Sequence, residues 1–264
     1  MSDADAYYGD AARDYEQRRN YAKKWAREQD IVSGIASRLA PEATILDCPV
    51  GTGRFFEIFA EYSLHVIAVD ISGDMLSLAA EKARGLGLEV NLVEASIFEL
   101  PLSEGWADLT VCGRLAAWLP KQDLVRALTE LRRVTSGRVL ITAHHRPNLL
   151  ADPAVLIQAT LRYALFGLKS FWRKFRDGRR TYVRWEAELH ELFALSGFAV
   201  ETKIPITAKR HGAQLSAWLL APGNTSRDGG RRCSAGQSAP SPPLSLDPGR
   251  IFASRDSQSN RSLA

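Results

Sequence analysis

The stretch from Ile45 to Phe55, ILDCPVGTGRF, contains the most informative pattern in the chain. An apolar run ends in Asp47, a loop with Gly51 and Gly53 follows, and a helical pattern begins directly afterwards. A strand, a tight glycine turn and a helix in this order are typical of the first unit of a doubly wound sheet. The stretch therefore predicts that the chain starts its sheet here.

The rest of the chain alternates apolar runs with helical patterns, as parallel strands joined by crossover helices do. Strands are predicted at 44–48, 65–70, 90–94, 108–112 and 138–143, and helices at 54–59, 73–84 and 123–134. A helical insertion at about 151–180, a helix at 186–195 and two β-rich runs at 198–206 and 215–220 follow. The link 207–214 is too short for a parallel crossover, so it predicts a hairpin. We therefore predict an α/β fold: a doubly wound, mostly parallel seven-stranded sheet with an antiparallel C-terminal hairpin.

The two ends of the chain differ from this central domain, which we place at residues 41–221. Residues 1–40 are predicted to be a helical segment rich in aromatic side chains, which form a lid over the site or pack on the sheet edge. Residues 222–264 are rich in Gly, Pro and Ser and predict a disordered tail. Six Arg and three Asp in this tail account for most of the net charge of +4. The nearly neutral remainder favours a small-molecule ligand over nucleic acid.

Cysteine usage and the amino terminus bear on the compartment. Cys48, Cys112 and Cys233 lie far apart without a CxxC pair, so neither a disulfide framework nor a metal site is predicted. The amino terminus is polar and acidic, unlike a secretion signal. No run approaches the roughly 18 apolar residues of a membrane-spanning helix. These features predict a cytoplasmic protein.

The chemistry of the glycine loop argues against a diphosphate ligand. In the dinucleotide pattern GxGxxG the third glycine lets the helix pack on the strand, and here Phe56 stands in its place. The carboxylate of Asp47 would repel a pyrophosphate at the helix start. Asp70 ends the second strand, where an acid accepts hydrogen bonds from ribose hydroxyls; alternatively it caps the helix beginning near Gly73. S-adenosylmethionine supplies a ribose and cationic groups without phosphate, whereas an NAD-type oxidoreductase fits less well.

Three stretches carry a resemblance to a known family: ILDCPVGTGRF (45–55), VIAVDIS (66–72) and EASIFELPLSEGWADLTVCGRL (94–115). They are similar to consecutive motifs of class I S-adenosylmethionine-dependent methyltransferases, especially the small-molecule branch that includes quinone-biosynthesis enzymes. The resemblance covers about residues 40–145 and implies S-adenosyl-L-methionine as the cofactor. Two departures are the Cys48-Pro49 start of the loop and Ser96, where the family commonly has Asp.

The resemblance also implies which residues bind the cofactor. The methionine part would lie against Asp47 and the backbone of Gly51 and Gly53, the ribose against Asp70, and the adenine against Ile71, Ser96 and Ile97. Cys112 to Arg114, after the fourth strand, would face the methyl group. Because a neutral hydroxyl forms weaker hydrogen bonds than a carboxylate, Ser96 should hold the adenine amino group less tightly than Asp would.

Candidate acceptor residues follow the later strands. His144 and His145, expected just after the fifth strand, are candidate general bases, although surface histidines are the alternative and methyl transfer does not require a base. Tyr15, Trp118 and Trp172 are candidate substrate contacts, with core packing as the alternative for Trp118.

The segment 161–185 contains an apolar stripe with a basic, aromatic flank. It is interpreted as a lid over the acceptor, as a peripheral membrane contact or, least favoured, as a nucleic-acid patch. The sequence as a whole predicts methyl transfer to a small molecule, apolar ones included. The alternative is a non-catalytic, membrane-associated binding module with a methyltransferase-like fold; the acceptor and the oligomeric state stay open.

Overall fold

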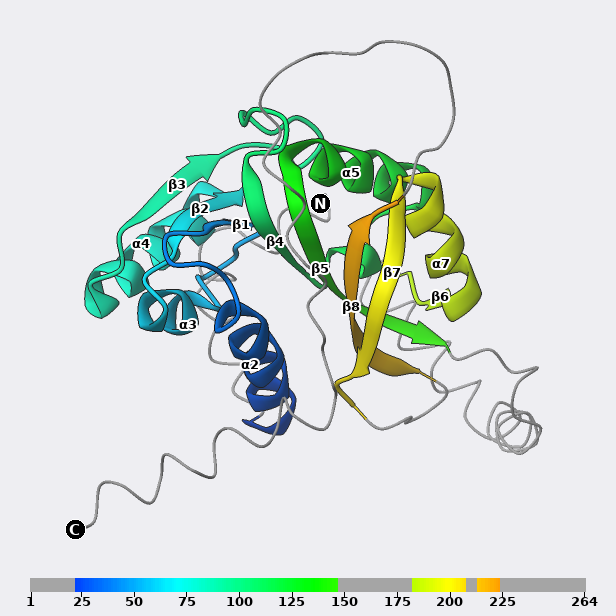
Figure 1. Ribbon diagram of the computed structural model, residues 1–264, viewed down its shortest axis with the longest axis horizontal. Coiled ribbons are helices and arrows are strands. Elements are labelled where there is room, and N and C mark those ends of the chain that lie inside the picture. The colour runs from blue at the N-terminus through cyan, green and yellow to red at the C-terminus, as the bar shows by residue number, and fades with distance from the viewer. Residues whose placement is uncertain (1–21, 147–181, 208–212, 224–264) are drawn as a thin grey trace.

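A computed structural model describes residues 22–146, 182–207 and 213–223 of the 264-residue chain. Its strands are β1 Thr44–Asp47, β2 His65–Asp70, β3 Val90–Glu94, β4 Ala107–Gly113, β5 Thr135–Arg146, β6 Arg184–Trp185, β7 Phe198–Pro205 and β8 Gln214–Pro222. The main sheet has the order β3-β2-β1-β4-β5-β8-β7, from left to right in Figure 1. β1 to β5 are parallel, whereas β8 pairs antiparallel with both β5 and β7. The predicted fold class is confirmed, and the two-residue β6, which pairs with β5, is an addition.

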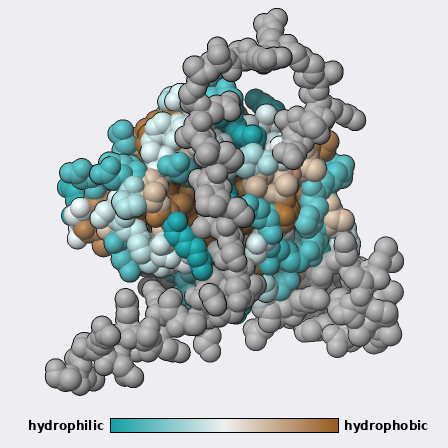
Figure 2. All heavy atoms as spheres, viewed as in Figure 1, coloured by the Kyte–Doolittle hydropathy of each residue, from teal (hydrophilic) through white to brown (hydrophobic). Residues whose placement is uncertain are grey.

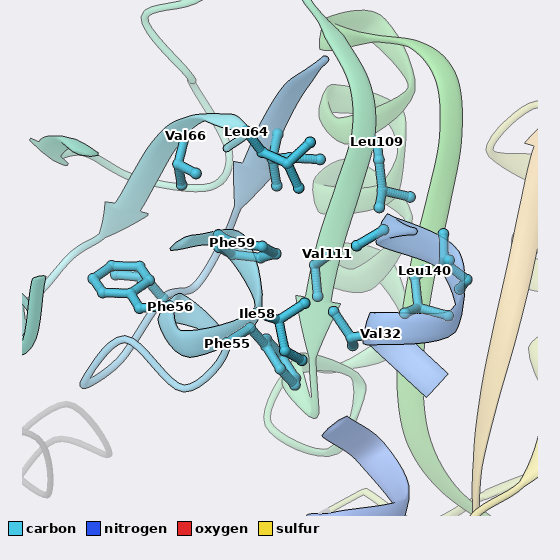
Figure 3. Close-up of a cluster of buried hydrophobic side chains, with 14 of the residues drawn as sticks. Val32, Phe55, Phe56, Ile58, Phe59, Leu64, Val66, Leu109, Val111 and Leu140 are labelled. Carbon is cyan, nitrogen blue, oxygen red and sulfur yellow. The ribbon is translucent and has the colours of Figure 1, made fainter. Parts of the chain in front are cut away.

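Helices cover both faces of the sheet. They are α2 Ala22–Ala36, α3 Phe56–Glu61, α4 Gly73–Leu86, α5 Lys121–Val134 and α7 Glu186–Leu195. One buried cluster packs α2, α3 and α4 on a face that we call the α2 face, and a second packs α5 and α7 on the opposite α5 face. Figure 3 shows part of the first, with Val32 of α2 close to Val111 of β4 and Leu140 of β5. The fold is therefore a three-layer α/β arrangement, as expected for a doubly wound sheet.

Local sequence explains where α4 begins and ends. Ser72 caps its amino terminus by accepting a hydrogen bond from the Met75 N–H at 3.3 Å. Gly87 ends the helix in the left-handed conformation, with φ 63°. Since Ser72 fills the capping position, the alternative interpretation of Asp70 as the cap of this helix is wrong.

The strand order defines a switch point. From β1 the chain runs outward to β2 and β3, then returns to β4 on the other side of β1 and continues to β5. The loops that leave the carboxyl ends of β1 and β4 therefore diverge, and ligands of doubly wound sheets bind beyond such a point. The glycine loop starts at this switch point.

Some predicted boundaries are corrected. β5 begins at Thr135, directly after α5, and continues to Arg146, so His144 and His145 belong to the strand and do not follow it. β8 extends to Pro222, where the tail was expected to begin. Residues 1–21 of the expected lid, the insertion at about 151–180 and the tail from 224 onward lie outside the described residues.

The surface of the described residues is mixed in polarity. Figure 2 shows apolar residues in brown between polar ones in teal on the face viewed. The large apolar side chains that are exposed are Ile71, Leu86, Val183, Trp185 and Leu195. No helix in this part of the chain is both long and apolar enough to cross a membrane.

Candidate functional site

The two aspartates expected at the site end adjacent strands. Asp47 closes β1 and Asp70 closes β2, with Asp47 in register with Ala68. Asp47 is also in register with Val111, a member of the cluster on the α2 face, so its side chain lies on that face. Both carboxylates are buried, with Asp47 exposed by 2% and Asp70 by 7%. Two acids are thus held at the carboxyl edge of the sheet, beside the switch point.

Asp70 also holds the glycine loop. The Gly51 N–H donates to Asp70 Oδ2 at 2.8 Å, and the Ser72 N–H donates to Oδ1 at 3.0 Å. Burial raises the pKa of Asp70, while the N–H groups of Ser72, Gly51 and Ile71 oppose that rise by favouring the ionised form. Asp70 therefore fixes the loop that connects β1 to α3, and its oxygens retain lone pairs for further donors.

The loop itself depends on glycine. Gly51 and Gly53 have φ of 55° and 73°, which other residues rarely adopt. A Cβ on Gly53 would lie 2.6 Å from the ring of Phe56, which is fully buried beneath the loop. Phe56 thus fills the space at the position where the dinucleotide pattern has its third glycine.

The residues expected to contact adenine lie beyond β2 and β3. Ile71 directly follows Asp70 and exposes 61% of its surface, so it offers an apolar face next to that carboxylate. Ser96 and Ile97 follow β3, which pairs with β2 through Asp70 and Glu94. The Ser96 hydroxyl accepts a hydrogen bond from the Phe98 N–H at 3.3 Å, and Ile97 is partly buried.

Two thiols lie under the site but on the other face. Cys48 and Cys112 are buried, free and part of the cluster on the α5 face. Burial raises the pKa of Cys48 well above its usual value, and burial together with Asp47 raises that of Cys112 to about 12. Both are therefore protonated at neutral pH and add no negative charge. The side chain of Cys112 points away from the face that carries Asp47, so its proposed contact with the cofactor is confined to its backbone.

The two histidines occupy opposite faces. His145 is fully buried, with Nε2 3.0 Å from Ser216 Oγ, Nδ1 3.6 Å from Glu186 Oε2 and its ring 4.8 Å from that of Trp218. Burial lowers its pKa to about 4, although Glu186 opposes that shift. His144, one residue earlier in β5, lies on the α2 face with Leu140 and pairs with Leu215. The structure thus separates the two candidates, and only His144 shares a face with Asp47.

A buried charge cluster that the sequence analysis missed lies at the switch point. The carboxylate of Glu28 on α2, 0% exposed, forms ion pairs with two guanidinium groups, those of Arg54 and Arg114. Arg54 follows the glycine loop after β1, and Arg114 directly follows β4. Glu28 therefore joins the N-terminal helix to the loops on both sides of the switch point.

The three members of this cluster are held by further contacts. Arg114 donates to Glu28 through Nε at 3.3 Å and through Nη2 at 2.9 Å. Its backbone is left-handed, with φ 61°, and its N–H donates to the carbonyl and hydroxyl oxygens of Thr142. Gln29 donates from Nε2 to the Arg54 carbonyl oxygen at 2.8 Å.

A signal for this cluster exists in the sequence. Glu28 precedes Val32 by four residues and Ile35 by seven, so it belongs to the stripe that α2 buries. An acid on an apolar stripe requires a buried partner, which the stripe alone does not identify.

The remaining candidates lie around the loop after β4. Trp118 follows the short 3-10 helix Leu115–Ala117 and is half-buried. The Tyr182 N–H donates to the Ala117 carbonyl at 2.8 Å, and the Arg184 guanidinium donates to the carbonyls of Ala116 and Leu119. These bonds fasten β6 to this loop. Tyr15 and Trp172 lie outside the described residues.

Comparisons with known proteins find similarity to methyltransferases. Residues 45–137 match a family described as a methyltransferase domain. The chain is 34% identical over 118 residues to the ubiquinone/menaquinone biosynthesis C-methyltransferase UbiE of Rhizobium johnstonii, covering 42% of this chain and 45% of that protein. The curated relatives that it matches are covered over about one third to one half of their lengths.

Solved structures show the same fold at low identity. Geranyl diphosphate methyltransferase in complex with S-adenosylmethionine aligns with a TM-score of 0.57 at 13% identity, covering 81% of this chain and 91% of that one. The cyclase SpnF aligns with a TM-score of 0.56 at 14% identity, covering 74% and 80%. The fold and the matched segment define a class I S-adenosylmethionine-dependent methyltransferase domain. Within that class, the chain is a distant homologue of the ubiquinone and menaquinone methyltransferases.

Proposed function

We propose that the protein transfers the sulfonium methyl group of S-adenosylmethionine to a small molecule. The observation that carries the proposal is the pair of buried carboxylates, Asp47 and Asp70, at the ends of β1 and β2 around a glycine loop. Asp47 would pair with the α-ammonium group and Asp70 would accept from the ribose hydroxyls. A carboxylate at the loop favours a cation there, because opposite charges in a partly desolvated site attract strongly.

The cofactor would extend from β1 across β2 towards β3. Asp47, Gly51 and Gly53 would contact its methionine part, and Ile71, Ser96 and Ile97 its adenine. When bound, the cofactor supplies an electrophilic methyl group on a positively charged sulfur. The chain's own contribution is then to hold the acceptor in line at about 3 to 3.5 Å and to exclude water.

The acceptor would lie towards β4 and β5, since the cofactor occupies the ends of β1, β2 and β3. His144 is the better-placed candidate for a base, because it lies on the same face as Asp47, whereas His145 is buried on the other face against Ser216. We expect His144→Gln to lower kcat and alter its pH profile while leaving cofactor affinity unchanged. A pH profile identical to that of the wild type would show that no base acts from this position.

Calorimetry tests the cofactor site. We expect Asp47→Asn to weaken S-adenosylmethionine binding at least tenfold, because the isosteric amide keeps the shape and loses the charge that the ammonium needs. Asp123→Asn is the matched control, since Asp123 lies in the first turn of α5 with its side chain 39% exposed. Unchanged affinity in the Asp47 variant would contradict the proposal.

Separate binding and labelling experiments test the two alternative functions. An NAD-type oxidoreductase would bind NADH, which a change in NADH fluorescence would detect. The carboxylate of Asp47 and the ring of Phe56 beneath the loop disfavour such binding. A non-catalytic membrane-binding module would sediment with anionic liposomes and yield no labelled product from a cell extract supplied with methyl-labelled cofactor. Its proposed contact, 161–185, falls mostly outside the described residues, although Val183 and Trp185 are exposed.

A further inference from the structure

The buried ion cluster of Glu28, Arg54 and Arg114 has Arg114 as its most exposed member. It contains two guanidinium groups and one carboxylate, with side-chain exposures of 5% for Arg54, 0% for Glu28 and 28% for Arg114. A buried charge is costly unless a counter-charge compensates it. Arg114 is therefore the member of the cluster that an anion from outside can reach.

The guanidinium of Arg114 has an edge available for that anion. The Glu28 carboxylate accepts hydrogen bonds from Nε and Nη2 of Arg114. Nη1 has no hydrogen-bond partner among residues 22–146, 182–207 and 213–223. A guanidinium binds carboxylate and phosphate oxygens through two parallel N–H donors, and its Nη1 and Nη2 edge is the one still open to an incoming group. Since the side chain is also 28% exposed, an incoming group can reach it.

The backbone of Arg114 holds this side chain in place. A left-handed φ of 61° in a non-glycine residue is strained and persists only where neighbours enforce it. Thr142 enforces it by accepting the Arg114 N–H on both its carbonyl and its hydroxyl oxygen, at 2.9 and 3.1 Å. Strain of this kind concentrates at functional sites.

The position of Arg114 assigns the anion to the acceptor and not to the cofactor. The proposed cofactor contacts follow β1, β2 and β3, whereas Arg114 follows β4 on the other side of the switch point and is tied to β5. We therefore propose that the methyl acceptor is an anion, with a carboxylate or phosphate group bound by Arg114, while Glu28 and Arg54 act as positioning residues behind it. This inference rests on the proposed function and narrows it to an acidic class of small molecule.

Depletion of a cell extract tests the charge of the acceptor before its identity is known. The extract is passed over an anion-exchange or a cation-exchange resin, then incubated with the full chain and methyl-labelled S-adenosylmethionine. We expect anion exchange to lower the labelled product at least tenfold and cation exchange to leave it unchanged. Phosphatase treatment separates the two sources of charge: loss of labelling indicates a phosphate, and retention a carboxylate.

Variants test the role of Arg114. We expect Arg114→Gln to raise the KM for the acceptor fraction at least tenfold, with kcat and S-adenosylhomocysteine affinity nearly unchanged, and Arg114→Lys to recover part of the loss. The variant keeps the neutral Glu28–Arg54 pair, so the fold should persist, which a thermal melt verifies. Arg126→Gln is the matched control, because the Arg126 side chain on α5 is 67% exposed; its KM should not change.

Three outcomes would overturn the inference while leaving the proposed function intact. These are full labelling after anion depletion, an unchanged KM in Arg114→Gln, and a loss of S-adenosylhomocysteine affinity in that variant that its decarboxylated analogue does not show. The last outcome would assign the cluster to the cofactor carboxylate. Failure of the wild-type protein to bind S-adenosylhomocysteine would instead refute the proposed function.

Discussion

Within the glycine loop, Gly53 is a position where a single added carbon should disturb the local packing. It combines a φ of 73° with the Phe56 ring, which a Cβ would approach to 2.6 Å. We expect Gly53→Ala to lower the free energy of unfolding by about 1 to 3 kcal/mol, because the loop must move away from the Phe56 ring to make room for the methyl group. The same movement should weaken cofactor binding. Chemical denaturation and calorimetry measure the two effects.

Gly85 provides the matched substitution. It lies in α4, and a Cβ there would meet nothing within 4 Å. Gly85→Ala should therefore stabilise the protein by roughly 0.5 to 1 kcal/mol, since alanine has the higher helix propensity. If Gly85→Ala changed the free energy of unfolding as Gly53→Ala does, the effect at Gly53 could not be assigned to the conformation of the glycine loop.

Among individual residues, those at strand ends could be predicted from the sequence, and those joined by packing could not. Asp47 and Asp70 follow apolar runs, and a parallel sheet brings such positions to one edge. The pairing of Glu28 with Arg54 and Arg114 spans up to 86 residues of chain, and no local pattern identifies partners at that separation. His145 was also placed wrongly as part of a loop, because β5 is longer than its apolar core.

Helix α2 is attached to the sheet by one buried acid as well as by apolar packing. We expect Glu28→Gln to lower the free energy of unfolding by about 3 to 5 kcal/mol, because two buried guanidinium groups lose their shared carboxylate. Adding Arg114→Gln should restore part of that loss, because one of those groups is then neutral.

Urea denaturation of the single and double variants measures this coupling. Glu61→Gln is the control, since Glu61 is an exposed acid at the end of α3. A double variant that is less stable than Glu28→Gln would show that the two guanidinium groups do not share the carboxylate.

Elements with regular spacing could be predicted well. β5 extends beyond its predicted bounds at both ends, because polar residues and glycine flank its apolar run, as at Ser136 and Gly137. Thr135 pairs with Ala107 of β4 across a register shift, and His144 and His145 pair with Leu215 and Gln214 of β8, so pairing extends β5 beyond its apolar run. β6 is only two residues long and is a strand because it pairs with His145 and Arg146 of β5, so no sequence pattern predicts it.

For the molecule as a whole, the buried His145 makes stability depend on pH. Its ring faces Glu186 and Ser216, and Lys203 and His144 add nearby positive charge that disfavours protonation. The folded pKa of about 4 lies below the ordinary value of 6.5, so the unfolded chain binds a proton between these limits and the folded chain does not. The free energy of unfolding should therefore fall as the pH is lowered from about 7 to 4, by up to about 3 kcal/mol.

Urea denaturation at several pH values tests this dependence. We expect His145→Gln to flatten the curve between pH 4 and 6.5, because the titrating ring is removed. His65→Gln, at the exposed start of β2, should retain the slope. If His145→Gln left the pH dependence of the free energy of unfolding unchanged, groups other than His145 would be responsible for the loss of stability at low pH.

The hydrogen bonds that join β6 and Tyr182 to the loop after β4 have an evolutionary consequence. Because Arg184 and Tyr182 bond to the backbone carbonyls of Ala116, Ala117 and Leu119, two regions separated by more than sixty residues form one mechanical unit. Recombination that imports either region from a homologue without the other would break that unit. Selection for a new acceptor should therefore alter both regions together, and a chimera should regain folding only when both come from the same parent.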